Sequence, residues 1–156
     1  MKARLTNLTM LLPGAMEALQ GIGAVASQPG LPHTTVDLVH MRASQINGCA
    51  VCADMHSRGA KKRGEKDERL FTLSGWRDAP YFDDAERAAL ALTEAVTRMA
   101  DREDPVPDSV WEEAARHFDE KALAALVLQI AAINLWNRLN VTTRQVAGEW
   151  TAQWAG

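Results

Sequence analysis

The sequence is short of cysteine and of uninterrupted apolar segments. Its 156 residues include two cysteines, too few for a framework of disulfides, and a bridge between positions only three apart would restrain almost none of the chain. No segment reaches the roughly 18 uncharged apolar residues that a membrane-spanning helix needs. Asn7 and Pro13 interrupt the N-terminal apolar stretch that would otherwise mimic a signal peptide. We therefore expect a cytoplasmic protein without a membrane partner. We also expect its cysteine pair to take part in chemistry rather than to stabilise the fold.

Basic residues are not in excess either. The 17 Lys and Arg residues and the 20 Asp and Glu residues give a net charge of −3, and no basic block is long enough for a nucleic-acid surface. The short run Lys61-Lys62-Arg63 lies where a helix is expected to end, and cations are favourable there because the carbonyl end of a helix is partly negative. We interpret the run as a solvated face and expect no nucleic-acid partner.

Alternation with period two, the mark of a strand, is also missing, whereas apolar spacings of three and four residues are frequent. The chain has the length of one domain with its own core, and it shows no repeat, low-complexity stretch or second domain. The expected fold class is all-α, a compact domain of about six to eight helices with C-x-x-C at the start of a central helix. The expected helices are residues 15–27, 34–47, 49–63, 65–74, 83–99, 109–118 and 120–139, with a loop at 75–80.

Two helix starts are marked by capping residues. Asp83 and Glu86 are spaced as a capping box, in which each side chain accepts a hydrogen bond from the backbone N–H of the other residue. The helix that they open has an apolar face that extends to Met99. Ser109 begins a similar pattern for the next helix, so we expect Ser109 to cap it.

The last long helix, 120–139, is apolar on nearly all sides. In its run from Ala122 to Trp136 only Gln129 and Asn134 are polar, which predicts a helix central to the domain or buried between subunits. Asn134 then needs a buried hydrogen-bond partner. Beyond this helix, the spacing of Trp150 and Trp154 predicts a further amphipathic segment.

The segment 45–56, Q-I-N-G-C-A-V-C-A-D-M-H, holds both cysteines and one of the four histidines. Asn47-Gly48 is typical of a helix C-terminus, so a new helix is expected to start at Cys49. A turn of 3.6 residues then places Cys49, Cys52 and His56 within about 60° of one another, with the cysteine Cα atoms about 5 to 5.5 Å apart. A disulfide accepts that separation, so the pair can cycle between dithiol and disulfide.

This arrangement favours redox chemistry. The thiolate is the reactive form of cysteine, and a helix N-terminus or a neighbouring imidazolium lowers the thiol pKa. His56 follows Cys52 by one turn, which suits it to stabilise that thiolate or to accept its proton. A thiolate that attacks a peroxide becomes a sulfenic acid, and a second thiol condenses with the acid to a disulfide.

Other interpretations of the same residues stay open. C-x-x-C is half of a structural zinc site, with His56 as a third ligand and His33, His40, His117 or a carboxylate as the fourth. Two buried cysteines can also simply pack a helix. His40 lies on the apolar face of helix 34–47, where a core role is the simplest interpretation. Asp37 lies in the first turn of that helix, where its charge offsets the helix dipole.

The segment 38–56, L-V-H-M-R-A-S-Q-I-N-G-C-A-V-C-A-D-M-H, closely resembles the core of AhpD-like alkylhydroperoxidases, which belong to the carboxymuconolactone decarboxylase family. The segments E-R-A-A-L at 86–90 and I-N-L-W-N-R at 133–138 are similar to that family too, so the resemblance covers residues from about 37 to 140. It implies an all-helical domain that assembles into homo-trimers or homo-hexamers. It also implies a hydroperoxide substrate and a dithiol reductant, with no cofactor and no metal.

The resemblance further implies roles for four catalytic residues. Cys52 matches the thiolate that attacks peroxide, Cys49 the resolving thiol and His56 the motif histidine. The family's glutamate lies twelve residues before the first cysteine, and the shorter Asp37 stands at that position here. Some relatives carry a histidine between the cysteines, where this chain has Ala50-Val51. The expected function is that of a thiol-dependent peroxidase.

Two further functions are alternatives. The decarboxylase branch of the family carries out proton transfers that need no dithiol, so an intact C-x-x-C argues against it. The other alternative is a non-enzymatic oligomer. It would use the disulfide to sense redox state or to bind a partner.

Overall fold

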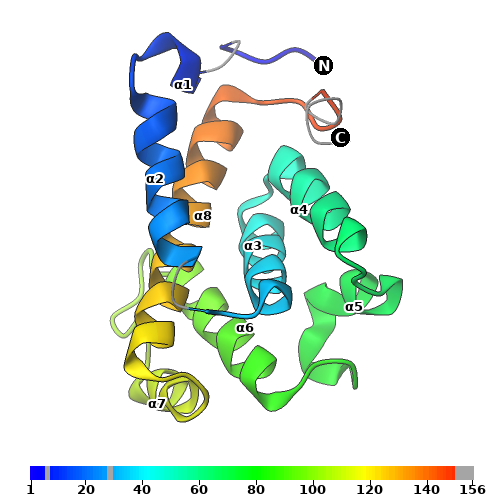
Figure 1. Ribbon diagram of the computed structural model, residues 1–156, viewed down its shortest axis with the longest axis vertical. Coiled ribbons are helices and arrows are strands. Elements are labelled where there is room, and N and C mark those ends of the chain that lie inside the picture. Colours follow the sequence, from blue (N-terminus) through cyan, green and yellow to red (C-terminus); the bar gives the residue numbers. More distant parts are fainter. Residues whose placement is uncertain (6–7, 28–29, 150–156) are drawn as a thin grey trace.

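The computed structural model describes residues 1–5, 8–27 and 30–149, and every regular element in these ranges is a helix (Figure 1). The elements are α1 (Leu8–Leu11), α2 (Ala15–Ser27), α3 (His33–Asn47), α4 (Ala50–Lys62), α5 (Asp67–Thr72), the 3-10 helix η1 (Leu73–Asp78), α6 (Asp84–Thr97), α7 (Asp108–His117) and α8 (Glu120–Thr143). The all-α fold class is confirmed, and C-x-x-C lies at the start of α4. Trp150 and Trp154 lie outside the described residues.

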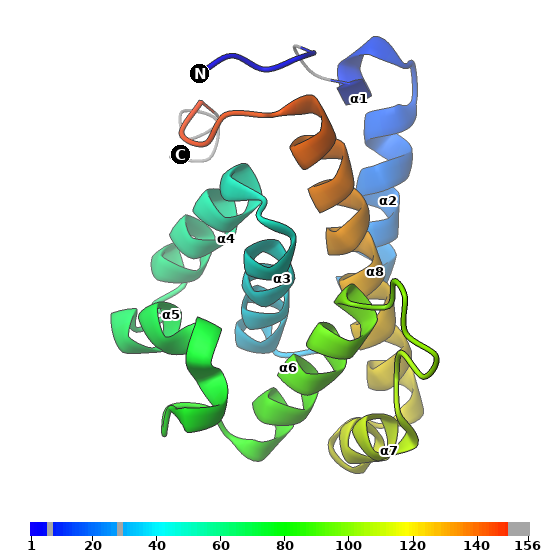
Figure 2. The same cartoon turned by 180° about the vertical axis from the view of Figure 1, so that it is seen from behind.

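α3 lies in the middle of the molecule and packs against α4, α8 and α6 (Figures 1 and 2). Its buried residues enter three different core clusters: Val39 packs with α6, α7 and α8, Leu38 packs with η1 and its neighbours, and Ala43 packs with both cysteines. Because one helix contributes to all three clusters, the position of the cysteine pair is tied to the whole core.

α8 is the second organising helix, and it packs against α2, α3 and α6. By length and composition it is the one helix of the described ranges that could cross a membrane, and 50% of its most apolar stretch is buried inside the protein. It continues past the expected end at Leu139 as far as Thr143. The N-terminal segment meets this extra turn, where the backbone N–H of Arg4 donates to the Thr143 carbonyl at 2.8 Å.

The break between α3 and α4 forms as the sequence predicts. Gly48 ends α3 in the left-handed conformation, with φ of 67°, which glycine adopts at little cost. The backbone N–H of Cys49 then donates back to the Ser44 carbonyl at 2.9 Å. Cys49 itself is extended and is the N-cap of α4. Two residues are therefore enough to stop one helix and start the next.

Helix starts were predicted with mixed success. The capping box of Asp83 and Glu86 is present, and both of its hydrogen bonds form. The expectation that Ser109 caps the next helix is wrong. α7 begins one residue earlier, with Pro107 as its N-cap and no side-chain cap. Proline has a fixed φ that suits this position, and its carbonyl accepts the backbone N–H of Val110 at 2.9 Å.

Two other expectations are corrected. Residues 75–80 are not all loop, because η1 (Leu73–Asp78) continues to Asp78 beyond a kink at Gly75. The cause is Trp76, a buried residue whose indole Nε1–H donates to Glu94 Oε1 at 2.9 Å, so that this segment is held against α6. Met99 does not belong to the apolar face of α6. The helix ends at Thr97, and Met99 is 50% exposed.

Candidate active site

The cysteines at the start of α4 form a disulfide, with Cα atoms 5.4 Å apart, as the helical spacing predicts. Both are almost completely buried, at 2% exposure for Cys49 and 3% for Cys52. They pack in a cluster with Ala43, Val51 and Ile133, against which Met55 and Trp136 also lie. The C-x-x-C pair is therefore a dithiol–disulfide couple in an apolar setting.

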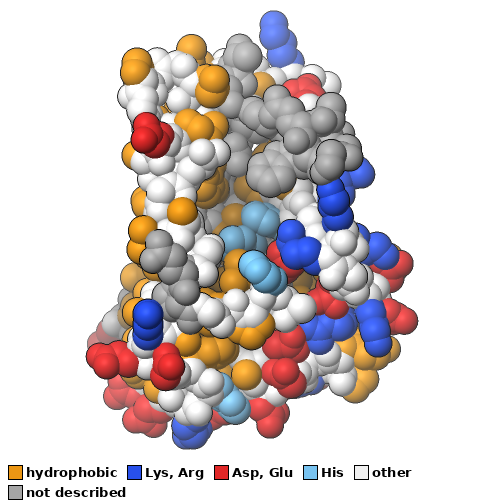
Figure 3. Space-filling view, in the orientation of Figure 1, with side chains coloured by type: hydrophobic (Ala, Val, Ile, Leu, Met, Phe, Trp, Pro, Cys, Tyr) orange, Lys and Arg blue, Asp and Glu red, His pale blue; other side chains and the backbone are white. Residues whose placement is uncertain are grey.

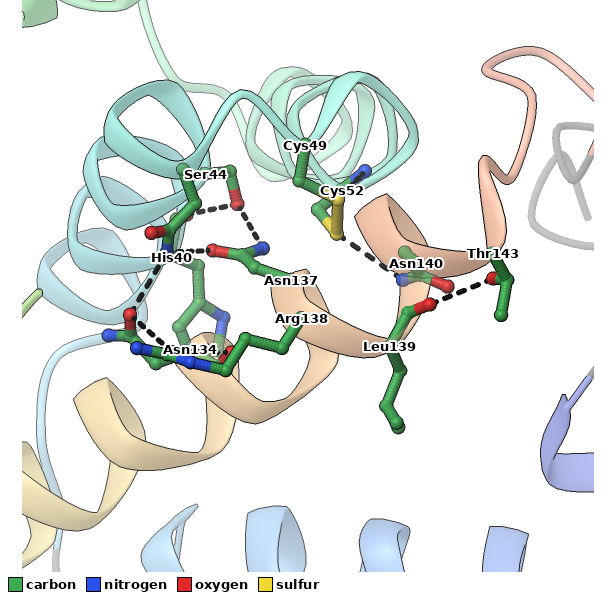
Figure 4. The surroundings of a disulfide bond; sticks show 11 residues. His40, Ser44, Cys49, Cys52, Asn134, Asn137, Arg138, Leu139, Asn140 and Thr143 are labelled. Carbon is green, nitrogen blue, oxygen red and sulfur yellow. Dashed lines mark hydrogen bonds between the residues drawn. A yellow bond between two sulfur atoms is a disulfide. The ribbon is translucent and has the colours of Figure 1, made fainter.

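Each sulfur receives one hydrogen bond. Cys49 Sγ accepts the backbone N–H of Cys52 at 3.3 Å, as the N-cap side chain of α4. Cys52 Sγ accepts the side-chain amide of Asn140, a residue of α8, at 3.4 Å (Figure 4). A donor aimed at a sulfur stabilises its thiolate over its thiol. Both cysteines thus have a group that favours the reactive form, one from the helix terminus and one from α8.

Further amides on α8 hold the turn between α3 and α4 in place. The side-chain nitrogen of Asn47 donates to Asn134 Oδ1 and to Asn137 Oδ1, at 2.9 Å in both cases. Asn137 Nδ2 donates to Ser44 Oγ at 3.1 Å (Figure 4). Asn134 has the buried partners that its sequence position required, since its amide nitrogen also donates to Thr97 Oγ1 and to a backbone carbonyl of α8. The polar interruptions of α8 therefore position the C-x-x-C turn.

His56 lies one turn beyond Cys52 and contacts a second histidine. The rings of His40 and His56 lie 4.6 Å apart between centroids and are tilted by 59°. His40 Nε2 lies 3.0 Å from Gln129 Oε1 on α8. Among the described residues, His56 has no hydrogen bond to either cysteine. The imidazoles form a pair supplied by α3 and α4, and His40, expected in the core, belongs to the candidate site.

Both imidazoles are held in their uncharged form. Burial, which takes the imidazolium out of water, lowers the pKa of His40 to about 4 against the opposing effects of its hydrogen bond to Gln129 and the charge of Asp37. Burial lowers the pKa of His56 to about 3, and the charges on His40 and Arg63 act in the same direction. In this disulfide form each imidazole therefore offers a lone pair near neutral pH, but its lowered pKa makes it a weak base.

Asp37 is bound by an arginine. Arg63, the C-cap of α4, donates from Nε to Asp37 Oδ2 at 2.9 Å and from Nη2 to Asp37 Oδ1. The Asp37 side chain is 9% exposed, whereas that of Arg63 is 48% exposed. No hydrogen bond joins Asp37 to Cys52 or His56 within the described part of the chain. Its influence on the histidine pair is the charge that acts on His40.

Histidine side chains gather in a hollow on one face of the molecule, among hydrophobic side chains and with basic side chains on one rim (Figure 3). Across residues 1–5, 8–27 and 30–149, no group of three or more His, Cys, Asp or Glu side chains is placed to bind a metal ion. The zinc interpretation of C-x-x-C therefore has no ligand set in these ranges.

Comparison with known proteins assigns the fold and the cysteine motif to a family. The sequence model of the carboxymuconolactone decarboxylase family matches residues 13–95, which include both cysteines, His56 and Asp37. The chain belongs to the carboxymuconolactone decarboxylase family. The resemblance drawn from the sequence is confirmed.

Relatives of the family include uncharacterised bacterial proteins. YdfG of Bacillus subtilis (strain 168) is 35% identical over 131 residues, which cover 84% of this chain and 88% of YdfG. YnjA of Escherichia coli (strain K12) is 34% identical over 103 residues, which cover 66% of this chain and 55% of YnjA.

Solved structures show the same fold. ATU0492 of Agrobacterium tumefaciens, a protein of unknown function described as a candidate antioxidant defence protein AhpD, has a TM-score of 0.87 and 34% identity over 94% of this chain and 98% of its own. The debrominase Bmp8, in complex with 2,3,4-tribromopyrrole, has a TM-score of 0.79 and 20% identity over 90% of this chain and 74% of its own. At that identity, the likeness to Bmp8 concerns the fold alone.

The structure brings together most of the predicted residues and, besides His40, adds three. Cys49 and Cys52 lie at the start of α4, and His56 lies one turn further along it. Asp37 is on α3, where Arg63 binds its carboxylate. Asn140 and Gln129 were not predicted as site residues, and Arg63 was interpreted as part of a solvated face. One signal could have found Asn140: Asn134, Asn137 and Asn140 recur at intervals of three along the last helix.

Proposed function

We propose that this chain is a thiol peroxidase that reduces organic hydroperoxides through the Cys49–Cys52 couple. The observation that carries the proposal is the pair itself: two cysteines that form a disulfide at a helix start, each with a hydrogen-bond donor on its sulfur. The 34% identity to ATU0492 along nearly the whole chain adds support. The fold alone does not select this activity, because Bmp8 is a debrominase of the same fold.

The proposed reaction starts at Cys52. Its thiolate attacks one oxygen of ROOH and the O–O bond breaks, so that Cys52 becomes a sulfenic acid and RO⁻ leaves as ROH after taking up a proton. The Cys49 thiolate then attacks the Cys52 sulfur, and the hydroxide that leaves is protonated to water. The peroxide gains two electrons and the cysteine pair loses two. An external dithiol restores the pair by exchange.

The remaining site residues handle protons in this proposal. His56, uncharged and one turn from Cys52, takes the thiol proton and later returns it to the leaving oxygen. A thiolate at Cys52 adds a negative charge that the disulfide lacks, and this raises the pKa of His56 during the step. Asp37, bound to Arg63, contributes its charge beside His40 without a direct contact with either thiol.

The apolar surroundings support an organic rather than an inorganic peroxide as substrate. Val51, Met55, Ile133 and Trp136 pack around the cysteine pair, and the transfer of an alkyl group from water to such a surface is favourable.

A cytoplasmic location and assembly into a trimer or hexamer are further parts of the proposal. Exposed apolar side chains near the N-terminus, Met10, Leu11 and Leu12, support assembly.

The test is peroxide turnover in the full chain. tert-Butyl hydroperoxide consumption with dithiothreitol as reductant should be fast in the wild type and reduced to background in Cys52→Ser. Equal rates in the two proteins contradict the proposal. Retained turnover in Cys52→Ser together with loss in Cys49→Ser would reverse the two thiol roles.

A further inference from the structure

A chain of three hydrogen bonds fixes how His40 is protonated. Ser27, the last residue of α2, donates its hydroxyl hydrogen to the Gly23 carbonyl at 2.8 Å. That hydroxyl oxygen can then only accept from Gln129, whose amide nitrogen lies 3.3 Å away. With its nitrogen facing Ser27, Gln129 presents its oxygen to His40 Nε2, at 3.0 Å. Because an amide oxygen only accepts, His40 Nε2 must carry the hydrogen.

The other ring nitrogen of His40 is therefore bare in the neutral state. A neutral imidazole has one N–H and one lone pair, so an Nε2–H tautomer leaves the lone pair on Nδ1. In the alternative tautomer, the Gln129 amide would have to flip so that its nitrogen donates to His40 and its oxygen faces Ser27. The Ser27 hydroxyl would then donate to Gln129, and the Gly23 carbonyl would lose its hydrogen bond from that hydroxyl. Side chains of α2 and α8 thus determine the tautomer of His40 on α3.

The charges around His40 come from two helices. Asp37 on α3, together with Arg63 and His56 from α4, are the charged or titratable groups that act on it. α8 and α2 contribute the uncharged side chains of Gln129 and Ser27. Since the Asp37 carboxylate is occupied by Arg63, the group in contact with His56 is an imidazole and not a carboxylate.

From this geometry we propose that His40 is a positioning residue of the dithiol site. Held as the Nε2–H tautomer by Gln129 and Ser27, its ring keeps His56 in one orientation and leaves the imidazole pair free to accept a single proton from the Cys52 thiol. The inference rests on the proposed function, in which His56 takes that proton. It gives α2 and α8 a part in a reaction whose predicted residues lie on α3 and α4 or at the turn between them.

The first test is independent of catalysis. Long-range proton–nitrogen NMR of the histidine rings in the full-length reduced protein should report His40 as the Nε2–H tautomer, with its signals assigned by their loss in His40→Gln. Gln129→Leu should yield a mixture of tautomers, because the acceptor is gone. A wild-type His40 with its hydrogen on Nδ1, or a wild-type mixture, overturns the proposal.

The second test measures the effect on Cys52. In a Cys49→Ser background, the rate of Cys52 alkylation by iodoacetamide is followed against pH. His40→Gln keeps an amide N–H for Gln129, so it is expected to fold, yet it has no imidazole to pair with His56. We expect alkylation about tenfold slower at neutral pH and a pH profile displaced upward, since one pKa unit corresponds to a tenfold change in thiolate fraction. His117→Asn, a histidine whose partner is Glu113, is the matched control.

The outcomes separate the two proposals. If the wild type turns over peroxide, and the rate and pH profile of Cys52 alkylation are unchanged in His40→Gln, the role of His40 is contradicted. The peroxidase proposal is not affected by that result. No wild-type turnover, with the tautomer fixed and the profile displaced in His40→Gln, contradicts the peroxidase and supports His40 as the residue that controls the Cys52 thiol. Gln129→Glu supplies a second variant: its carboxylate should hold His40 charged, disfavour a proton on His56 and slow alkylation.

Discussion

Arg63 binds the carboxylate of Asp37 with two nitrogens of its guanidinium, one of them 2.9 Å from Oδ2. The pair joins the C-terminus of α4 to the first turns of α3, 26 residues apart in the chain. α4 is thus fastened to α3 at both ends, by this ion pair at its C-terminus and by the Gly48 turn at its N-terminus. The ion pair occupies the carboxylate of Asp37, and the ring that contacts His56 is that of His40.

Loss of this ion pair should weaken the fold moderately. Arg63→Met leaves a nearly buried carboxylate without its partner, and because the arginine is half exposed, water replaces part of the interaction. We expect the free energy of unfolding to fall by about 1–2 kcal/mol, measured by urea denaturation. In an Asp37→Asn background the same substitution should cost clearly less. An equal cost in both backgrounds would show that the two side chains do not interact.

Gly59 provides a milder way to displace Arg63. A Cβ at position 59 would lie 2.9 Å from Arg63 Nη2, so Gly59→Ala pushes the guanidinium aside. Gly21→Ala is the matched control, since Gly21 is also helical and its Cβ would meet nothing within 4 Å. The control should stabilise the protein by about 0.5–1 kcal/mol through helix propensity. Gly59→Ala should stabilise less or destabilise, and an equal gain at both positions would contradict the account of Arg63.

Asn140 should control the reactivity of Cys52 in particular. Asn140→Leu removes the amide that donates to Cys52 Sγ, and a hydrogen bond to a charged group is worth about 1.5–3 kcal/mol. In the Cys49→Ser background, the Cys52 thiol should titrate at higher pH and alkylate about tenfold more slowly at neutral pH. Cys49 in a Cys52→Ser background should respond far less, because its sulfur has a backbone donor. A similar slowing of both cysteines would point to a general distortion.

Asn137 should matter for stability. It is fully buried, at 0% exposure, and it bonds both Asn47 and Ser44. Asn137→Leu keeps the volume but removes one acceptor from Asn47 and the amide donor from the buried Ser44 hydroxyl, so we expect a loss of about 1–3 kcal/mol in the free energy of unfolding. Leu135→Asn, a change at a partly exposed position on the same helix, should cost under about 1 kcal/mol. Thermal and urea unfolding of both variants provide the measurement.

The histidine pair predicts how stability depends on pH. In the unfolded chain both imidazoles titrate near 6.5, whereas in the folded disulfide form their pKa values are about 4 and about 3. Between these values the unfolded chain binds more protons, so stability falls as pH drops from about 6.5 toward 4. The fall should be shallower in His40→Gln/His56→Gln than in the wild type, as urea unfolding across this range will show. Identical pH dependence would mean that the histidines are not held neutral.

The parts of the structure that were predictable depend on residues close in sequence. The capping box of Asp83 and Glu86 and the stop at Gly48 each need only a few neighbours, and both form as expected. The cysteine separation follows from helix geometry alone. By contrast, Ser109 does not cap α7, because the preceding proline supplies a start that needs no side chain.

The rest of the candidate site depends on contacts between distant residues. Asn140 reaches Cys52 across 88 residues, and Gln129 reaches His40 across 89. Nothing local in the sequence indicates that these amides face the cysteines and the histidine, because that depends on how α8 lies against α3 and α4. Asp37 shows the same limit: the resemblance predicted a site role for it, but the arginine that occupies its carboxylate is at the far end of the next helix.

The central claim is that Cys52 attacks the peroxide and Cys49 resolves the product. Reduced Cys49→Ser should be mixed with one equivalent of tert-butyl hydroperoxide in the presence of dimedone, which traps sulfenic acids, and then examined by peptide mass spectrometry. The account predicts one dimedone adduct, on Cys52, with one equivalent of tert-butanol released and no adduct in reduced wild type, where Cys49 closes the disulfide first. Absence of the adduct, with the peroxide left unconsumed, would contradict it.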